Sequence, residues 1–426
     1  MMTEQSQNIR SLVDKDTGRI ERDTFGRRDL FDQEMEKIFT RTWQFVGHES
    51  QIPNSGDFFL SRLGGESVIM TRDREGQVRV LLNSCRHRGM RVCRYDEGHT
   101  SVFYCPYHGW SYNLDGSLRH VTEEKNEYGA GFDKKDWGLK EVARLKIIHG
   151  LVWATWDADG PDLDEYLGPA RQMLDYAFLG WDGESEIEVV GSVQKWIIPS
   201  NWKIVAENFI GDMLHNVSHQ SVDMVGIGPN SDRGRRDTPG GIIQSTYPNG
   251  HGGIYLDYRD MPRNFYSESE VSANYYQECL KRRFEIFGEG AHLTFGVGTI
   301  FPNMSFHGTQ PRTILIGHPL DVNKTEMWRW YFVDKKAPAE TKAMLRKYFM
   351  RYSGPGGMTE QDDMENWNYA TEASRGLISR QLAYNYMAGL DKGGTREDIP
   401  GAQIGSTNTE GNARNYYATW AKMLGV

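Results

Sequence analysis

The sequence carries two short segments that combine cysteine with histidine, Cys85-Arg-His-Arg-Gly89 and Cys105-Pro-Tyr-His-Gly-Trp110. The first reads Cys-x-His and the second Cys-x2-His, and seventeen residues lie between them. Tetrahedral zinc also accepts two cysteines and two histidines, but zinc sites usually group ligands of one kind. A [2Fe-2S] centre of the Rieske type has two cysteines on one iron and two histidines on the other, so each mixed segment can hold both irons.

The residues around these segments have the pattern of short β-strands. Val78–Leu82 and Leu151–Trp156 are rich in apolar and β-branched residues, and turns of Gly, Asp and Asn separate such runs. Helical spacing of apolar residues appears at Leu163–Leu179, whereas Gly226–Gly253 is Gly-rich and polar, which predicts a long loop or lid. The sequence therefore predicts a small all-β module inserted into a larger α+β domain.

A second group of polar residues lies in Asn201–His219, which has a clear helical pattern. At about 100° per residue, Asn208, Asp212, His215 and His219 fall within about 60° of one helix face. An amphipathic helix on the surface would leave such a stripe in water. The apolar residues beside the stripe predict a largely buried helix instead, and two buried imidazoles one turn apart are suited to binding a metal.

Two histidines and one carboxylate form the facial triad of non-haem Fe(II), which leaves positions open for O2 and water. The polar stripe supplies two histidines, and its carboxylate partner must come from elsewhere in the chain. Glu360–Glu365 offers four carboxylates just after the loop Gly354-Pro-Gly-Gly357, which predicts that they turn inward. Spacing alone does not choose among the four, and a solvated run of charges is the alternative.

Composition argues against several other functions. The chain has 426 residues, with 49 Lys and Arg against 58 Asp and Glu, and a net charge of −9 disfavours nucleic-acid binding. No segment approaches the roughly 18 apolar residues of a membrane span, and the N-terminal segment lacks the apolar run of a secretory signal, so we expect a cytoplasmic protein without membrane contact. No Gly-x-Gly-x-x-Gly follows a predicted strand, which disfavours a nicotinamide or flavin site.

In these motifs the chain resembles the large (α) subunits of Rieske non-haem iron aromatic ring-hydroxylating dioxygenases, especially those that act on phenylpropionate, biphenyl and naphthalene. The resemblance extends over almost the whole chain. Besides the two cysteine–histidine segments, its motifs are Thr42-Trp43, Gly47-His48-Glu49-Ser50, Val193-Gln-Lys-Trp196, Asn201-Trp-Lys203, Glu207-Asn-Phe209, Glu360-Gln-Asp-Asp363 and Glu365-Asn-Trp367.

The resemblance implies an α+β fold of two domains. An all-β Rieske [2Fe-2S] domain, residues 42–157, is inserted in a larger catalytic domain, residues 1–41 and 158–426, which has an antiparallel sheet flanked by helices. It also implies one [2Fe-2S] cluster. The cluster ligands are Cys85 and Cys105 on one iron and His87 and His108 on the other.

The resemblance further implies one mononuclear Fe(II), bound by His215, His219 and Asp363. Asp212 is then the bridge that carries electrons to His215 from the partner subunit's His108. Such a bridge requires a ring of subunits, because within one chain of this fold the two centres are too far apart. Family members form trimers, commonly with three small β subunits, which predicts a homotrimer or an α3β3 assembly.

The resemblance places Asn208 near the open face of the iron, as a catalytic residue together with Asp212. Candidates for the substrate pocket are Phe209, Met213, Asn216 and Thr359. Two features depart from the family pattern. Only three residues separate the two histidine ligands, where relatives have four or five, and Thr359 stands where relatives often have a bulky aromatic residue, which predicts a wider or more polar pocket.

The predicted function is that of a terminal oxygenase that uses O2 and NADH-derived electrons to cis-dihydroxylate an aromatic hydrocarbon or aromatic acid. A ferredoxin, an NADH-dependent reductase, or both supply the electrons. A Rieske monooxygenase or demethylase, which inserts one oxygen atom, is the alternative with the same iron sites. An electron-transfer Rieske protein without catalysis, and a zinc-stabilised binding module, are alternatives from other classes.

Overall fold

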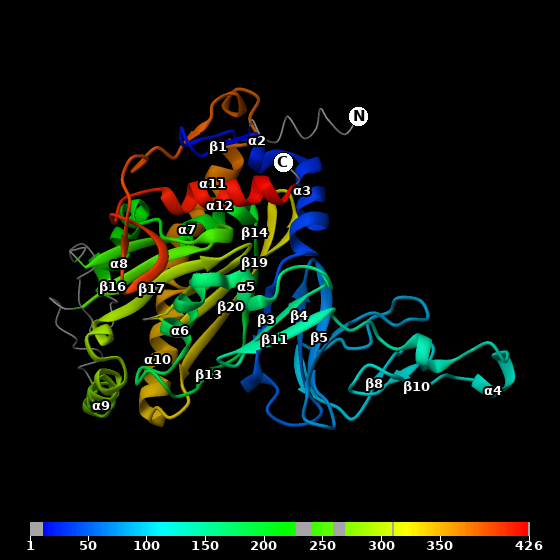
Figure 1. Ribbon diagram of the computed structural model, residues 1–426. Coiled ribbons are helices and arrows are strands. Elements are labelled where there is room, and N and C mark those ends of the chain that lie inside the picture. The colour runs from blue at the N-terminus through cyan, green and yellow to red at the C-terminus, as the bar shows by residue number, and fades with distance from the viewer. Residues whose placement is uncertain (1–11, 227–240, 259–268, 309–310, 425–426) are drawn as a thin grey trace. The chain divides into compact units, whose positions relative to one another are not determined.

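The computed structural model describes residues 12–226, 241–258, 269–308 and 311–424 (Figure 1). The chain divides into two compact units, Phe39–Pro161 and the combination of Met1–Ile38 with Asp162–Val426. The first unit is called the small unit below and the second the large unit. The predicted insertion of 42–157 lies a few residues inside the bounds of the small unit.

The small unit is built from three antiparallel sheets, with strand orders β6-β5-β4-β7, β11-β12-β3 and β10-β9-β8. The all-β architecture predicted from the sequence is thus confirmed. The first cysteine–histidine segment follows β6, and the second joins β8 to β9. The strands are β3 (Gln44–His48), β4 (Asp57–Leu63), β5 (Glu66–Arg72), β6 (Val78–Leu82), β7 (Glu97–His99), β8 (Phe103–Tyr104), β9 (Ser111–Tyr112), β10 (Leu118–His120), β11 (Arg144–Ile148) and β12 (Leu151–Thr155).

A ten-stranded antiparallel sheet forms the centre of the large unit, with the order β13-β20-β19-β18-β17-β16-β15-β23-β22 and β14 paired to β20. Its middle strands are rich in β-branched and aromatic residues and are buried along most of their length. The strands are β13 (Ile187–Val189), β14 (Gln194–Ile198), β15 (Ile242–Thr246), β16 (Gly252–Asp257), β17 (Leu293–Ile300), β18 (Met304–His307), β19 (Thr313–Asp321), β20 (Lys324–Asp334), β22 (Gly394–Arg396) and β23 (Ile399–Gly405).

Helices pack against this sheet, as predicted. Helix α7 contacts β17, β18 and β19, α11 packs on α7, and α12 contacts β15 and β16 (Figure 1). The main helices are α3 (Arg28–Glu34), α5 (Leu163–Leu167), α6 (Arg171–Phe178), α7 (Trp202–Phe209), α8 (Gln220–Val225), α9 (Glu270–Phe287), α10 (Ala339–Tyr352), α11 (Met358–Ala373) and α12 (Gly411–Met423). Among the described residues, no helix is long and apolar enough to cross a membrane.

One sequence prediction about the sheet is wrong. Gly226–Gly253 was expected to be a long loop, but its described C-terminal part contains β15 and the start of β16, which pair as an antiparallel hairpin. The turn of this hairpin holds Asn249 and Gly250 at positive φ, of 60° and 76°. Polar and glycine residues therefore mark a tight turn between two strands here, and the flanking strands place Ile242 and Ile254 in the sheet.

Candidate metal centres

The two cysteine–histidine segments fold into loops of the same form. In each, the glycine N–H donates to the carbonyl oxygen of the cysteine four residues earlier, from Gly89 to Cys85 at 2.8 Å and from Gly109 to Cys105 at 3.1 Å. Both glycines have positive φ, 74° and 78°, which other residues rarely adopt. The two loops therefore share the same cysteine-to-glycine turn, with the histidine two residues after the cysteine in the first and three in the second.

The four predicted cluster ligands converge within the small unit. The His87 and His108 rings lie edge to face with their centroids 4.5 Å apart. Cys85 and Cys105 are both buried and carry free thiols. Burial raises the pKa of the Cys105 thiol, and the neighbouring Cys85 thiol raises it further. The Cys85 thiol is thus close enough to oppose ionisation of Cys105, as expected of two groups that share one cation site.

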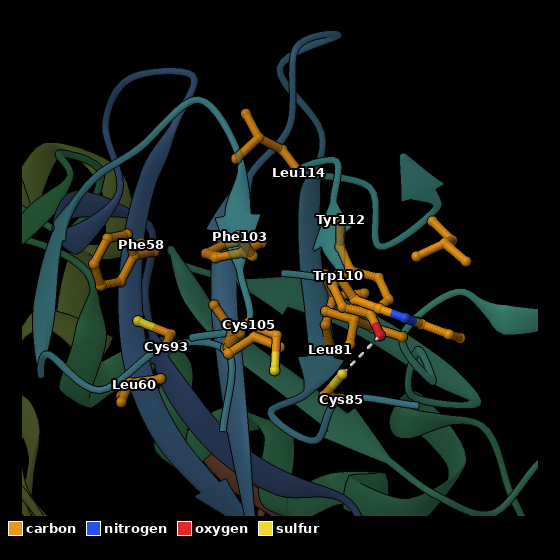
Figure 2. Packing of buried hydrophobic residues seen from close by; sticks show 14 of the residues in the cluster. Phe58, Leu60, Leu81, Cys85, Cys93, Phe103, Cys105, Trp110, Tyr112 and Leu114 are labelled. Carbon is orange, nitrogen blue, oxygen red and sulfur yellow. Dashed lines mark hydrogen bonds between the residues drawn. The ribbon is translucent and has the colours of Figure 1, made fainter. Parts of the chain in front are cut away.

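The residues next to these ligands fix their orientation. Tyr112 places its hydroxyl 3.2 Å from the Cys85 sulfur, a contact drawn in Figure 2, and accepts a hydrogen bond from the Arg86 N–H at 3.0 Å. Trp110 stacks on the His87 ring with centroids 5.2 Å apart. Burial and the nearby His108 lower the pKa of His87. His87 Nδ1 is buried without a hydrogen-bond partner among the described residues, so it is available to bind a metal. Together with the two thiols, this neutral imidazole nitrogen fits a Rieske cluster.

The polar stripe predicted from Asn208 to His219 does not lie on one continuous helix, so this prediction is wrong. Helix α7 ends at Phe209, Gly211 has φ of 122°, and the chain resumes as a 3-10 helix, η5 (Leu214–His219). The Ile210 carbonyl oxygen accepts a hydrogen bond from the Asn412 side chain at 2.6 Å, and the Gly211 carbonyl oxygen accepts one from Gln244 at 2.8 Å. Asn412 and Gln244 thus occupy carbonyl oxygens that would accept intrahelical hydrogen bonds in a continuous helix. The helix is broken here, so the four residues do not share one helix face as predicted.

Three of the predicted residues nevertheless meet. Asp363 Oδ1, on α11, lies 3.5 Å from His215 Nε2 and 3.3 Å from His219 Nε2. The ligand atoms of the three residues lie within 4.8 Å of one another. Asp363 Oδ1 is buried and has no hydrogen-bond partner among the described residues. Because a buried carboxylate oxygen without a partner is costly, this cluster fits a bound cation, and its two histidines with one carboxylate match the donor set of non-haem Fe(II).

A further carboxylate stands behind each histidine. Asp212 Oδ2 lies 3.4 Å from His215 Nδ1, and Asp362 Oδ2 lies 3.4 Å from His219 Nδ1. Burial lowers the pKa of His215, but Asp212 and Asp363 outweigh burial, so the pKa of His215 lies above its ordinary value. The site therefore attracts positive charge. Sequence reasoning missed the place of Asp362, because all carboxylates of Glu360–Glu365 were equivalent by spacing.

The other members of that acidic segment have separate roles. Glu360 is buried in an ion pair with Arg329, and the Gly354 N–H donates to it at 3.3 Å. Burial raises the pKa of Glu360, although Arg329 opposes the rise. Glu365 is exposed. Helix periodicity on α11 thus turns Asp363 inward and Glu365 outward.

A cavity of about 180 Å³ opens beside the histidine cluster. All four predicted pocket residues line it, together with Asn208, whose amide nitrogen lies 3.5 Å from His215 Nε2. Sequence reasoning missed the apolar wall from β15, β16 and β17, because those residues are far apart in the chain. The lining residues are Asn208, Phe209, Asp212, Met213, His215, Asn216, His219, Ile242, Ile254, Leu256, Gly296, Val297, His307, Tyr352, Ser353, Thr359, Glu360 and Asp363.

Comparison with protein families gives two matches that together cover most of the chain. The Rieske [2Fe-2S] domain family matches residues 42–143, and the catalytic domain of the ring-hydroxylating α subunit matches residues 170–425. The first match contains both cysteine–histidine segments, and the second contains the histidine–aspartate cluster.

Individual proteins are similar over nearly the same length. The biphenyl dioxygenase subunit alpha of Paraburkholderia xenovorans (strain LB400) is 36% identical, covering 98% of this chain and 93% of its own. The biphenyl 2,3-dioxygenase subunit alpha of Rhodococcus jostii (strain RHA1) is 37% identical, covering 98% and 91%. A solved structure of naphthalene 1,2-dioxygenase with indole in its active site superposes with a TM-score of 0.88 at 31% identity, covering 97% of this chain and 93% of that one.

Proposed function

The chain belongs to the α subunits of the aromatic ring-hydroxylating dioxygenases, and we propose that it adds both atoms of O2 to an aromatic ring as a terminal oxygenase. Residues 42–157 are assigned to the Rieske domain, and residues 1–41 with 158–426 to the catalytic domain. The single observation that carries the proposal is the convergence of His215, His219 and Asp363 beside a ring-sized cavity.

In the small unit, Cys85 and Cys105 are proposed to hold one iron of a [2Fe-2S] cluster, and His87 and His108 the other. The matched loops and the unpaired His87 nitrogen support this assignment. When bound, the cluster supplies single electrons and the mononuclear Fe(II) supplies O2 activation. The Tyr112 hydroxyl orients the Cys85 sulfur, and stacking on Trp110 fixes the His87 ring.

In the large unit, His215, His219 and Asp363 are proposed to hold the mononuclear iron. Asp362 then orients His219 through Nδ1, which leaves Nε2 directed at the shared site. Asp212 does the same for His215 and is proposed to be the path for electrons from the partner subunit's His108.

The remaining predicted residues are proposed to control access to the iron and to bind the substrate. Asn208 stands beside His215 Nε2, where its amide limits how molecules approach the open face. Phe209, Met213, Asn216 and Thr359 are proposed to bind the substrate, because each lines the cavity.

The lining favours a neutral ring over an aromatic acid. The cavity of about 180 Å³ is somewhat larger than an apolar protein cavity of roughly 150 Å³ that binds benzene. Ile242, Ile254 and Val297 supply an apolar wall, and none of the described residues that line the cavity is a lysine or arginine. Apart from the proposed iron, whose charge Asp363 and Asp212 already oppose, the described lining offers a ring carboxylate no cation, so the proposed substrate is a monocyclic aromatic hydrocarbon with a small substituent.

The proposed assembly is a homotrimer or an α3β3 complex in the cytoplasm. A ferredoxin, an NADH-dependent reductase, or both are the proposed electron donors. The family acts through electron-transfer partners, which supports this assignment of partners.

Turnover with labelled O2 tests the proposal. The holoenzyme, supplied with a surrogate reductase, is offered matched pairs such as toluene and benzoate. We expect a cis-dihydrodiol with two labelled oxygens from the hydrocarbon and little product from the acid. A single labelled oxygen would support the monooxygenase alternative, and oxidation of the acid alone would contradict the proposed substrate class.

An iron-site variant separates catalysis from electron transfer. Asp363→Ala removes the carboxylate shared by both histidines, so we expect loss of turnover and of one iron per chain, with an unchanged Rieske absorption spectrum. Glu365→Gln, an exposed carboxylate on the same helix, is the matched control and should keep both. Full activity of the Asp363 variant would show that Asp363 does not bind a catalytic iron.

A further inference from the structure

A second, smaller cavity lies next to the histidine site on the side of α12. Its volume of about 30 Å³ is enough for one or two water molecules. Asp212 lines both this cavity and the larger one, so it stands between them. Most of the residues that line it have polar side chains, and the full lining is Glu207, Ile210, Gly211, Asp212, Gln244, Tyr386, Thr409, Glu410, Asn412 and Ala413.

Glu207 is one of three carboxyl groups on the wall of this cavity, with Asp212 and Glu410. It lies on α7, directly before Asn208. Tyr386 donates a hydrogen bond to its Oε2 at 2.9 Å, and Tyr417, on α12, donates a second to the same oxygen. Its other oxygen, Oε1, accepts no hydrogen bond from the described part of the chain. Two donors on one oxygen and none on the other leave Oε1 as the position for a proton.

The charges around Glu207 favour that proton. The titratable groups that face it are Tyr386, Tyr417, Asp212 and Glu410. None of the described residues that line the cavity is a lysine or arginine; Arg414 acts on Glu410, and its guanidinium donates to the Tyr386 and Ala388 carbonyl oxygens. Burial raises the pKa of Glu207 to about 8, the two tyrosine hydrogen bonds oppose the rise, and the charges of Asp212 and Glu410 add to it. Three carboxyl groups around so small a cavity cannot all be ionised at low cost.

We propose that Glu207 is the proton reservoir of the mononuclear centre and delivers a proton through water in the small cavity toward the Asp212 face of the substrate pocket. The inference rests on the proposed function. Addition of O2 to a ring double bond as two hydroxyl groups consumes two electrons and two protons. The electrons come from the reductase system, and Glu207 supplies one of the protons.

The proton transfer conserves charge and atoms. The O–H bond of the Glu207 carboxyl group breaks as a new O–H bond forms on the cavity water, and that water releases one of its own protons toward the pocket. The resulting carboxylate is stabilised by the hydrogen bonds from Tyr386 and Tyr417. It regains its proton from solvent before the next turnover, so the residue is restored and only solvent protons are consumed.

The test uses the holoenzyme and one conservative variant, Glu207→Gln. Glutamine keeps the shape and accepts both tyrosine hydrogen bonds, but it has no acidic proton. Infrared spectroscopy follows the C=O stretch of protonated carboxyl groups as pH rises, and single-turnover product formation is measured in reduced, substrate-loaded enzyme. In the wild type, a carboxyl band should disappear with a midpoint near pH 8, and the rate should fall about tenfold between pH 7 and pH 9.

The variant should lack that band and show a low rate that does not change over this pH range, with unchanged iron content. Glu410→Gln, which removes a different carboxyl group from the same cavity, should keep the titrating band. A wild-type pH profile in the Glu207 variant, or a band that survives the substitution, overturns the proposal. If the variant fails to fold, Tyr417→Phe decides, since loss of a donor to the carboxylate should move the wild-type midpoint upward and an unmoved midpoint contradicts the proposal.

Failure of the proposed function gives a different result. If no aromatic compound is oxidised by the wild type, the terminal-oxygenase proposal fails. The infrared titration still reports whether Glu207 holds a proton at neutral pH.

Discussion

Two buried polar clusters lie along helix α7, and they satisfy their charges in opposite ways. At its N-terminal end Lys203 forms an ion pair with Glu34, from α3, at 2.5 Å, and both side chains are 1% exposed. Glu34 also accepts hydrogen bonds from the indole N–H groups of Trp202 and Trp420, each at 2.8 Å. Beyond the C-terminal end, the His215, His219 and Asp363 atoms approach only to 3.3 and 3.5 Å.

The difference separates a structural cluster from a functional one. Every partner of Glu34 comes from the protein, and the Lys203 ammonium also faces three aromatic rings at 5.2–5.8 Å. Burial lowers the pKa of Lys203, although Glu34 opposes this effect. The histidine cluster instead leaves Asp363 Oδ1 without a hydrogen-bond partner among the described residues. A complete cluster holds helices together, whereas an incomplete one keeps affinity for a ligand that the chain does not supply.

Loss of the Lys203 charge should produce the largest change in stability. Lys203→Met keeps the length of the side chain but leaves the Glu34 carboxylate buried without a cation. We expect the free energy of unfolding of the large unit to fall by about 3–5 kcal/mol, measured by denaturant titration of tryptophan fluorescence.

The double variant Glu34→Gln/Lys203→Met provides the control. It removes both charges and keeps an acceptor for one of the two indoles, so it should recover most of the loss. Equal losses in the single and double variants would show that packing, and not the unpaired charge, sets the stability here.

His251 offers an intermediate case, because it is buried, neutral and fully paired. Its ring nitrogens contact the Tyr166 carbonyl oxygen at 2.9 Å and the Phe301 N–H at 3.0 Å. Burial lowers the pKa of His251 to about 4 from an ordinary value of 6.5. The unfolded chain therefore binds one more proton between these values, and stability is lost as pH falls from about 6.5 toward 4.

At pH 4.5 this linkage should remove about 2.5 kcal/mol of stability relative to pH 7.5. His251→Gln keeps a donor and an acceptor but cannot titrate, so its stability should depend less on pH by that amount. Denaturant titrations of both proteins at the two pH values measure the difference, and every pH effect that the two proteins share cancels in the comparison. An equal loss of stability in both proteins would show that His251 is not the group that titrates.

The cysteine–histidine loops were predictable because their information is local. Cys85 and His87 are two residues apart, and Gly89, whose N–H closes the turn, is four residues after Cys85, so residue type and spacing already specify the loop. The α+β character of the larger domain followed from the pattern, and its antiparallel sheet flanked by helices followed from the family resemblance. The break after α7 did not, because it depends on Gln244 and Asn412, distant residues that bond to the Ile210 and Gly211 carbonyls.

The iron site shows the same limit. Its two histidines were recognisable in sequence, although the calculated helical arc that grouped them does not exist in the structure. Family resemblance, and not spacing, selected Asp363 among four carboxylates. Ile242, Ile254 and Val297 form the apolar wall of the cavity and carry no chemical signal of their own. Their position is set by the register of β15, β16 and β17, which local patterns do not encode.

A smaller effect is expected for Asp362, whose carboxylate lies behind His219 in the histidine–aspartate cluster. Asp362 contacts His219 Nδ1 and accepts a hydrogen bond from Ser221 at 2.9 Å. Asp362→Asn keeps the shape and the Ser221 bond but withdraws the negative charge from the imidazole. We expect affinity for the mononuclear iron to fall about 10-fold to 100-fold, measured by chelator competition with the Rieske absorption as an internal reference. An affinity equal to that of Glu365→Gln would show that Asp362 does not act through His219.

The smallest effect is expected for an ion pair that differs from Glu34–Lys203 mainly in exposure. Arg282 donates two hydrogen bonds to Glu184, at 2.9 and 3.0 Å, and both side chains are about half exposed. Its hydrogen bonds to Glu184 raise the pKa of Arg282, yet water solvates both ions whether or not the pair forms. Arg282→Met should leave the denaturation midpoint unchanged, whereas the same loss of charge at Lys203 should lower it strongly. If both variants lower the midpoint equally, burial is not what gives the Glu34 cluster its importance, and the contrast drawn along α7 fails.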